Sequence, residues 1–457
     1  MAIIAPLKGV RYDPDTAGPL EDIVAPPYDV VSKNEEASYA SRSPFNIIRL
    51  DITSEPGWQG DLNRKRSKKS ADLFDRWLKE GVLLRDQEPS FYPYDITYQR
   101  PDGSLCIRRG FVCLVQLTAF DQGEVKPHAH AFRTVIDDRL ELTRHCRAQF
   151  GQVLSLFSDP HGDVIKTLDD TSNISISTVT DANGNIHTLR KVVDKDAIVK
   201  IQNLIARKNL YIADGHHRYL SALAYQKELK RSGTFSGDRP ENFIMMCLSP
   251  MEDNGLLILP AHRLIKFPGP LTASDVTDRL QNIFDLKELK EGSRETIIND
   301  LLSRMDEEQL INDRRRTCFG FYHPGEDRGF MLKLMDSKRQ DLKRYQPSLR
   351  ELDVIAFSEF IVDQVLQLDE ELCEQENLIT FHRDTSDMLD ISVKMATMEG
   401  GDTPLLFLLN RPRLEQVKNL SEQGQLMPPK STCFFPELVS GLVLNRLIEN
   451  EKILIIE

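Results

Sequence analysis

One short polar segment of the chain combines a carboxylate, a glycine, two imidazoles and a guanidinium. Its residues are Asp214, Gly215, His216, His217 and Arg218. A glycine lets the backbone approach a ligand closely, and the unpaired N–H groups at the start of a helix attract phosphate. An arginine beside them can bind two oxygens of one anion. The segment therefore predicts an anion-binding turn.

The side chains of this turn could also take part in a reaction. His216 and His217 can donate to phosphate or shuttle protons near neutral pH, and Asp214 could orient a histidine or help to hold a metal. Alternatively, Asp214 only caps the helix and the histidines pack under a loop. Zinc is disfavoured because adjacent side chains rarely converge on one ion, whereas a divalent cation carried in with nucleotide phosphate is compatible with the turn. Catalytic roles are therefore assigned to Asp214, His216, His217 and Arg218, and phosphate contacts to Gly215, His216, His217 and Arg218.

A rigid turn near the start of the chain offers a further candidate base. Two prolines at 26 and 27 stiffen the backbone before Asp29. A fixed carboxylate can deprotonate or orient a hydroxyl, although a turn-stabilising role for the same side chain is equally compatible.

Three other polar segments could contact an anionic cofactor. His128 belongs to an imidazole-rich stretch that could instead be a solvated loop, and Arg263 could equally form a surface ion pair. The loop at 430–432 offers an ammonium and two hydroxyls, but no G-x-x-x-x-G precedes it, so it is not a P-loop. The candidate cofactor-binding residues are His128, His262, Arg263, Lys430, Ser431 and Thr432.

Local patterns predict the elements that position these residues. A buried strand over 209–213 followed by a helix over 219–229 places the polar segment on a strand-to-helix turn. Hairpins are expected for 90–98 with 108–117 and around 181–185. Residues 1 to about 60 are expected to be short extended pieces, and 352–368 a helix. Because hairpins and helices alternate without a βαβ rhythm, the fold class is α+β with mixed sheets.

Bulk properties restrict the class of protein. A length of 457 residues suggests two or three domains. The composition, with 40% hydrophobic and 28% charged residues, is that of a globular protein. We expect domains at 1–265, 266–345 and 346–457, the last of which could pack back on the first. A net charge of −12 argues against binding to duplex nucleic acid.

Two further features concern the compartment. Seven scattered cysteines favour reduced thiols, and no apolar stretch approaches the roughly 20 residues of a membrane span. A cytoplasmic protein without membrane partners is expected, and the oligomeric state stays open.

Five ordered blocks of sequence give the chain a resemblance to a known family. They are Ala-Pro-Pro-Tyr-Asp-Val, Pro-Phe-Asn-Ile-Ile-Arg-Leu, Ala-Asp-Gly-His-His-Arg-Tyr, Leu-Pro-Ala-His-Arg and Met-Pro-Pro-Lys-Ser-Thr, at 25–30, 44–50, 213–219, 259–263 and 427–432. In this order they resemble the bacterial and archaeal domain of unknown function 1015 (DUF1015). That resemblance implies no activity by itself.

The turn at 214–218 further resembles the phosphate-binding motif of the ParB/sulfiredoxin-like superfamily, which includes partition-protein CTPases, sulfiredoxins and free serine kinases. The resemblance implies a ParB/sulfiredoxin-like nucleotide-binding core with an additional α/β subdomain, and a nucleotide (ATP, ADP or CTP) with Mg²⁺ as cofactor. It also implies phosphate contacts from 215–218, with Asp214 assisting a hydroxyl or a cation. The implied reaction is phosphotransfer, in the kinase or phosphatase direction, on a small hydroxylated metabolite such as serine or phosphoserine.

The chain departs from the family pattern beside the turn. Where the family usually has His-Glu-x-Thr, this sequence has His128-Ala129-His130-Ala131. A carboxylate and a hydroxyl are therefore missing, which leaves a catalytically inactive nucleotide-binding switch as the alternative function. Redox repair of the sulfiredoxin kind is disfavoured because that chemistry needs a cysteine in the turn.

Overall fold

Two compact units make up the chain. The computed structural model describes residues 1–52, 61–100, 102–121, 123–172, 175–231, 233, 237–289, 292–309, 316–369, 373, 378–397, 402–428 and 430–455. Unit 1 comprises Met1–Leu257 and Phe434–Glu457, and unit 2 comprises Ile258–Cys433. The expected boundaries at 265 and 345 do not coincide with this division. The third expected range is split, because residues 346–433 belong to unit 2 and 434–457 to unit 1.

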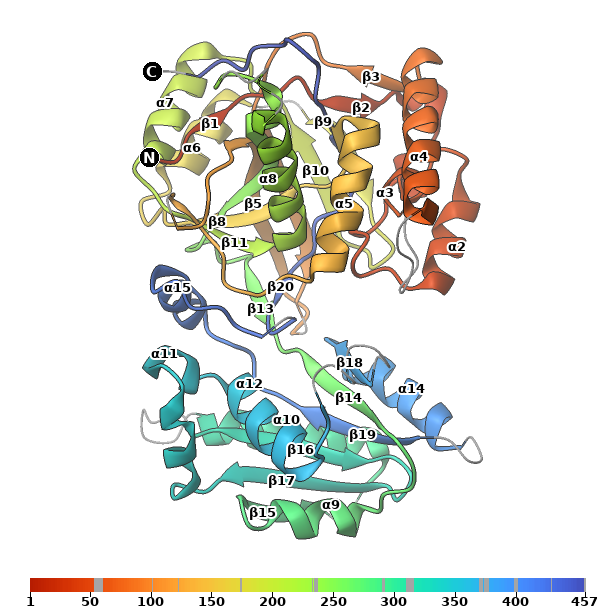
Figure 1. Cartoon of the computed structure of the whole chain (residues 1–457), viewed down its shortest axis with the longest axis vertical. Coiled ribbons are helices and arrows are strands. Elements are labelled where there is room, and N and C mark those ends of the chain that lie inside the picture. Colours follow the sequence, from red (N-terminus) through yellow and green to blue (C-terminus); the bar gives the residue numbers. More distant parts are fainter. Residues whose placement is uncertain are drawn as a thin grey trace. The chain divides into compact units, whose positions relative to one another are not determined.

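The main sheet of unit 1 is mixed, as the α+β class requires (Figure 1). Its strand order is β6-β11-β8-β12-β5-β4-β10-β9, with β1 paired to β5. Strand β8 is antiparallel to β11 and parallel to β12. The strands are β1 (Ile4–Ala5), β4 (Tyr92–Gln99), β5 (Leu105–Gln116), β6 (Val125–Lys126), β8 (Val153–Phe157), β9 (Ser175–Thr180), β10 (Ile186–Arg190), β11 (Leu210–Asp214) and β12 (Phe243–Pro250).

Two short ribbons complete the strands of unit 1. Strand β2 (Val10–Tyr12) pairs with β3 (Leu83–Arg85), and β7 (Ala148–Gln149) pairs with β21 (Asn445–Arg446). The β7–β21 ribbon joins residues 148–149 to the segment that returns to unit 1 after unit 2.

Both predicted hairpins are confirmed. Strands β4 and β5 are antiparallel neighbours, as are β9 and β10. The connections contain Asp-Gly and Asn-Gly, whose residues tolerate the positive φ of tight turns; Gly103 and Gly184 have φ of 84° and 81°.

The helices of unit 1 supply the apolar faces that cover its sheet and its N-terminal region. One core joins Phe111 and Phe157 of the sheet to Ile201 of α7 and Tyr219 of α8. A second core contains Trp77 of α4. The helices are α1 (Pro14–Ala17), η1 (Leu20–Asp22), α2 (Lys33–Arg42), α3 (Ile48–Asp51), α4 (Asp61–Lys79), α5 (Arg133–Cys146), α6 (Asp163–Thr171), α7 (Lys195–Ala206), α8 (His216–Arg231) and η2 (Pro240–Asn242).

The expectation of extended pieces over residues 1 to about 60 is wrong for α2 and α3. Helix α2 begins with a capping box, in which the Ser32 hydroxyl accepts from Glu35 N and the Glu35 carboxylate accepts from Ser32 N. This reciprocal arrangement satisfies donors that the first turn would otherwise leave unpaired.

Unit 2 has an antiparallel sheet of its own in the order β15-β17-β16-β19-β14-β18. Its strands are β14 (His262–Phe267), β15 (Phe284–Leu289), β16 (Cys318–His323), β17 (Arg328–Leu334), β18 (Ile379–His382) and β19 (Thr403–Leu408). The chain leaves unit 1 through β13 (Leu257–Leu259) and returns through β20 (Cys433–Phe435).

One helix of unit 2 differs from its prediction. The expected helix at 352–368 consists of α12 (Asp353–Ala356) followed by a π-helix, η5 (Phe357–Val365), in which one extra residue enters the turn. The other helices are α9 (Ala273–Leu280), α10 (Arg294–Gln309), η4 (Lys338–Arg344), α11 (Pro347–Arg350), α14 (Thr385–Ala396) and α15 (Leu414–Glu422). Among the described helices, none is both long and apolar enough to cross a bilayer.

Candidate functional site

The polar turn lies between β11 and α8 in unit 1. Strand β11 ends at Asp214, helix α8 begins at His216, and Gly215 between them has a φ of 91°. That left-handed conformation favours glycine. Asp214 is the register partner of Leu154 in the antiparallel strand β8. The residues that precede β8, Gly151 and Gln152, therefore lie beside the turn.

The Arg218 side chain is fixed at the centre of this site. Its Nη2 donates to Asp214 Oδ2 at 2.5 Å, and its Nη1 donates to the carbonyl of Gln152. A Cβ on Gly215 would lie 3.0 Å from Arg218 Cζ, and a Cβ on Gly151 would lie 3.3 Å from Arg218 Nη1. The two glycines thus leave the space that the guanidinium fills. Its Nε is buried without a hydrogen-bond partner among the described residues.

The turn that carries Asp29 belongs to the same site. Ala25 exchanges both backbone hydrogen bonds with Ser440, which holds the turn against the returning C-terminal segment. Burial raises the pKa of Asp29, the Asp214 carboxylate raises it further, and Arg218 opposes this shift. Asp29 Oδ1 is buried and has no hydrogen-bond partner among the described residues. The structure therefore brings together a buried carboxyl group and a fixed guanidinium.

The two histidines of the turn fasten a neighbouring segment. His216 Nε2 accepts from His128 N at 3.2 Å, and His217 Nε2 accepts from Phe132 N at 2.9 Å. The His128 ring in turn donates through Nδ1 to the carbonyl of Ile212 at 2.6 Å. Because the Nε2 atoms of His216 and His217 act as acceptors here, they do not donate to a phosphate, and the segment at 128–132 is attached to the turn.

Burial also determines the charge of these imidazoles. It lowers the pKa of His128 to about 4. Burial likewise lowers the pKa of His216 well below its usual value, and the nearby His128, His217 and Arg218 lower it further. His128 and His216 are therefore neutral at physiological pH.

A second buried guanidinium, which is not among the predicted site residues, supports the site. Arg139 pairs with Asp51 (Nη1 to Oδ1, 3.1 Å) and with Asp138 (Nη2 to Oδ2, 2.6 Å). Its Cζ lies 4.0 Å from the centre of the Tyr28 ring. From sequence, the charged stretch at 137–139 could face the same anion or belong to a solvated charged helix. In the structure Asp138 and Arg139 are both buried. Tyr28 could have been singled out because it adjoins Asp29 in a rigid turn.

The remaining candidate residues belong to unit 2. His262 and Arg263 lie on β14, and His262 Nδ1 accepts from Leu409 N at 3.1 Å. Burial lowers the pKa of His262 to about 4. Arg263 is only 4% exposed, so it is not in a surface ion pair.

The loop at 430–432 lies near the same strand. Lys430 Nζ lies 5.7 Å from the centre of the Phe381 ring, and Arg263 Cζ lies 4.3 Å from the same ring centre. Ser431 Oγ donates to the carbonyl of Pro428 at 2.7 Å, and Thr432 is half-buried. Residue 429 of the expected loop lies outside the described residues.

Metal ions in proteins need several ligand groups close together. Within the described ranges, no three histidine, cysteine, aspartate or glutamate side chains are grouped so that they could hold a metal ion.

Sequence comparison establishes the family of the chain. The model of a family described as "Protein of unknown function (DUF1015)" matches residues 4–355. The chain belongs to the DUF1015 family. Comparison with curated proteins finds no match.

Comparison with solved structures gives matches with TM-scores below 0.5. A free serine kinase in complex with AMP has 13% identity and a TM-score of 0.34, over 72% of this chain and 92% of that chain. A conserved hypothetical protein from Pyrococcus furiosus has 13% identity and a TM-score of 0.34, over 72% and 95%. SbnI with a C-terminal truncation from Staphylococcus aureus has 9% identity and a TM-score of 0.33, over 74% and 90%.

Proposed function

We propose that unit 1 binds a nucleotide at the Asp214 turn and transfers its terminal phosphoryl group to the hydroxyl of a small metabolite. The observation that carries the proposal is the Arg218 guanidinium at the start of α8, whose buried Nε has no hydrogen-bond partner among the described residues. A helix N-terminus and a guanidinium together stabilise the charge on a transferring phosphoryl group. The nucleotide and serine as the metabolite come from the sequence resemblance.

The two carboxylates of the site have different roles in this reaction. Asp214 is held by Arg218 and orients the guanidinium. Asp29, with its raised pKa and unpartnered Oδ1, is the base. The substrate oxygen forms a bond to the terminal phosphorus of the nucleotide while the bond from that phosphorus to its bridging oxygen breaks. The hydroxyl proton passes to Asp29, and the nucleotide leaves with one phosphate fewer. In the phosphatase direction, water forms a bond to the phosphorus of the phosphorylated metabolite while the bond from that phosphorus to the metabolite oxygen breaks. Asp29 takes a proton from the water and returns it to the metabolite oxygen, and inorganic phosphate leaves.

Mg²⁺ would accompany the nucleotide and neutralise phosphate charge when bound. The described residues do not form a metal cage, so the reaction assigns no ligand of the chain to the ion.

The experiment incubates the full chain with ATP, ADP or CTP, Mg²⁺, and serine or phosphoserine, and follows phosphate by ³¹P NMR. Conversion is expected, and Arg218→Ala should lower the rate by about 100-fold or more, as loss of a transition-state donor does. A matched control is Arg446→Ala, since Arg446 is a surface residue 3.4 Å from Asp75, and its activity should equal that of the wild type. An Arg218→Ala variant with full activity and nucleotide affinity would contradict the proposal.

A second candidate is a nucleotide-binding switch without turnover. It is favoured by Ala129 and Ala131, which stand where the family usually has a glutamate and a threonine. Saturable nucleotide binding by the wild type without conversion of any substrate would support this candidate and exclude the phosphotransferase.

A further inference from the structure

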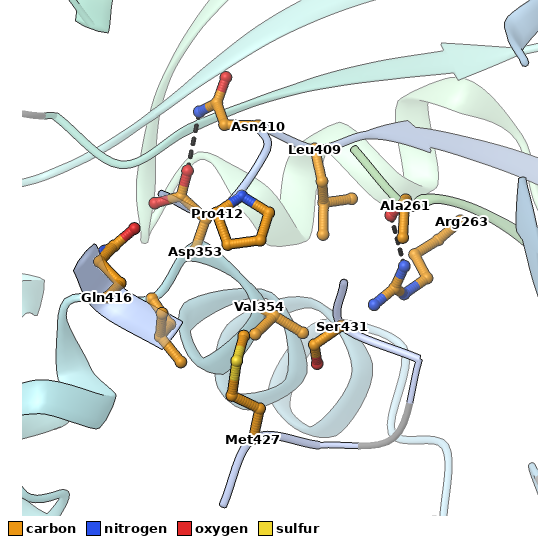
Figure 2. A pocket seen from close by; sticks show the side chains of 11 residues that line it. Ala261, Arg263, Asp353, Val354, Leu409, Asn410, Pro412, Gln416, Met427 and Ser431 are labelled. Carbon is orange, nitrogen blue, oxygen red and sulfur yellow. Dashed lines mark hydrogen bonds between the residues drawn. The ribbon is translucent and has the colours of Figure 1, made fainter. Parts of the chain in front are cut away.

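Unit 2 contains a pocket in which a buried guanidinium lacks an acidic partner. The pocket is lined by Arg263 of β14, by the start of α12, by the segment after β19 and by residues 427 and 431 (Figure 2). The single hydrogen bond of the Arg263 side chain to the described residues runs from Nη1 to the carbonyl of Ala261. No carboxylate among the described residues forms an ion pair with it, and burial lowers its pKa to about 9.

The other polar groups of the pocket already have partners. Asn410 Nδ2 donates to Asp353 Oδ2 at 2.8 Å, and Gln416 Nε2 donates to the carbonyl of Glu351 at 3.1 Å. The Ser431 hydroxyl donates to the carbonyl of Pro428. In Figure 2 the guanidinium of Arg263 lies near Ser431, whereas Asn410 and Asp353 lie at another side of the pocket. Arg263 is therefore the group with donors left for a ligand.

The charges and walls of the pocket define the ligand class. A planar guanidinium fork matches the two oxygens of a carboxylate. The charges of Arg263 and Asp353 cancel, so a bound monoanion leaves the pocket with a single negative charge, whereas a phosphate dianion leaves two. Val354, Leu409 and Met427 supply apolar surface between the polar groups. The pocket thus favours an apolar body attached to one carboxylate.

We propose that this pocket of unit 2 binds a small monocarboxylate with a short apolar body, with Arg263 as its anchor. The site is separate from the nucleotide turn proposed for unit 1 and does not depend on it. It also changes the role of Arg263, which the sequence assigned to a nucleotide cofactor.

The test titrates the full chain with isosteric probes and measures binding by isothermal calorimetry and saturation-transfer NMR. The probes are butyrate, butanol, butylamine and inorganic phosphate. Saturable binding of butyrate, at least tenfold tighter than that of the other three, is expected. Stronger binding of phosphate than of butyrate, or no binding of butyrate, overturns the proposal without any variant.

Variants then locate the site. Arg263→Met should weaken butyrate binding at least tenfold, and Arg263→Lys should weaken it less because the charge is kept without the fork. Arg411→Met is the matched control, since Arg411 is exposed and adjoins two pocket residues in sequence, and its affinity should stay within twofold of the wild type. Circular dichroism checks that each variant is folded. The proposal fails if folded Arg263→Met binds butyrate as tightly as the wild type does. If Arg263→Met does not fold, the proposal fails if folded Arg263→Lys binds butyrate as tightly as the wild type does.

Discussion

Two buried arginines, one in each unit, occupy opposite electrostatic environments. Arg218 is near Asp214 and Asp29, whose charges outweigh its burial and raise its pKa. Arg263 forms no ion pair with a carboxylate of the described residues, and burial lowers its pKa to about 9. The charge of the Arg218 guanidinium is stabilised by carboxylates of the folded chain, whereas the charge of the Arg263 guanidinium is not. Burial alone therefore does not show whether an arginine is structural or ligand-binding. The presence or absence of carboxylates around the guanidinium distinguishes the two cases.

The largest effect on this comparison is expected from Arg218→Met. The change leaves Asp29 and Asp214 without their cation, and breaking a buried ion pair costs several kcal/mol. Because the Asp214 side chain is 49% exposed, water compensates in part, and we expect a loss of about 2–3 kcal/mol in the free energy of unfolding. Urea denaturation measures it. Arg446→Met is the surface control, with an expected loss below about 0.5 kcal/mol; equal losses in the two variants would contradict the interpretation.

A smaller effect is expected when the guanidinium is displaced rather than removed. Gly215→Ala introduces a Cβ 3.0 Å from Arg218 Cζ at a φ of 91°. Gly162→Ala is its matched control, because Gly162 also has a positive φ, of 69°, but no atom within 4 Å of the added Cβ. Both should lose about 1 kcal/mol from backbone strain, and Gly215→Ala should lose more and also weaken nucleotide binding. Identical stabilities and identical binding would show that the close approach has no role.

Arg263→Met tests the other side of the comparison. It removes a buried charge that has no acidic partner and leaves an apolar chain of similar length. Replacing buried charges by apolar side chains is often neutral or stabilising, so the free energy of unfolding without ligand should stay equal or rise by up to about 1 kcal/mol. Thermal and urea unfolding measure it. A loss as large as that of Arg218→Met would remove the distinction between the two arginines.

The smallest effect concerns pH. Burial raises the pKa values of Asp29 and Asp51 in the folded chain, so the folded state binds their protons more tightly than the unfolded state does. Their contribution to stability therefore falls as pH rises from the unfolded value near 4 through the raised folded values. Asp29→Asn removes one of the two groups. Its stability relative to the wild type should increase with pH in urea titrations between about pH 4 and pH 8; a constant difference would contradict the assignment.

The location of the site could be predicted, but its composition could not. A strand, a polar segment and a helix follow one another at 209–229, so local patterns place the turn correctly. Gln152, Tyr28 and Ser440 reach the turn through the β8–β11 register and the Ala25–Ser440 pairing, which link residues far apart in sequence. No local pattern encodes such pairings.

The burial of individual side chains was also beyond local reasoning. His216 and His217 were expected to contact phosphate, and their Nε2 atoms instead accept from backbone N–H groups at 128 and 132. Helix α2, in contrast, was missed although Ser32 and Glu35 form a recognisable capping signal. The contacts of the two histidines depend on the tertiary structure, which the sequence does not display, and the two prolines at 26 and 27 do not prevent a helix from beginning at Lys33.

The return of residues 434–457 to unit 1 has a consequence for synthesis of the protein. Ser440 holds the turn of Asp29, and β21 pairs with β7, yet both follow all of unit 2 in the chain. A ribosome delivers unit 2 before it delivers these contacts, so unit 2 can fold while unit 1 still lacks its closing segment. The turn at Asp29 consequently gains its support late in translation, and nascent chains that stop within unit 2 carry Arg218 without the completed site around it.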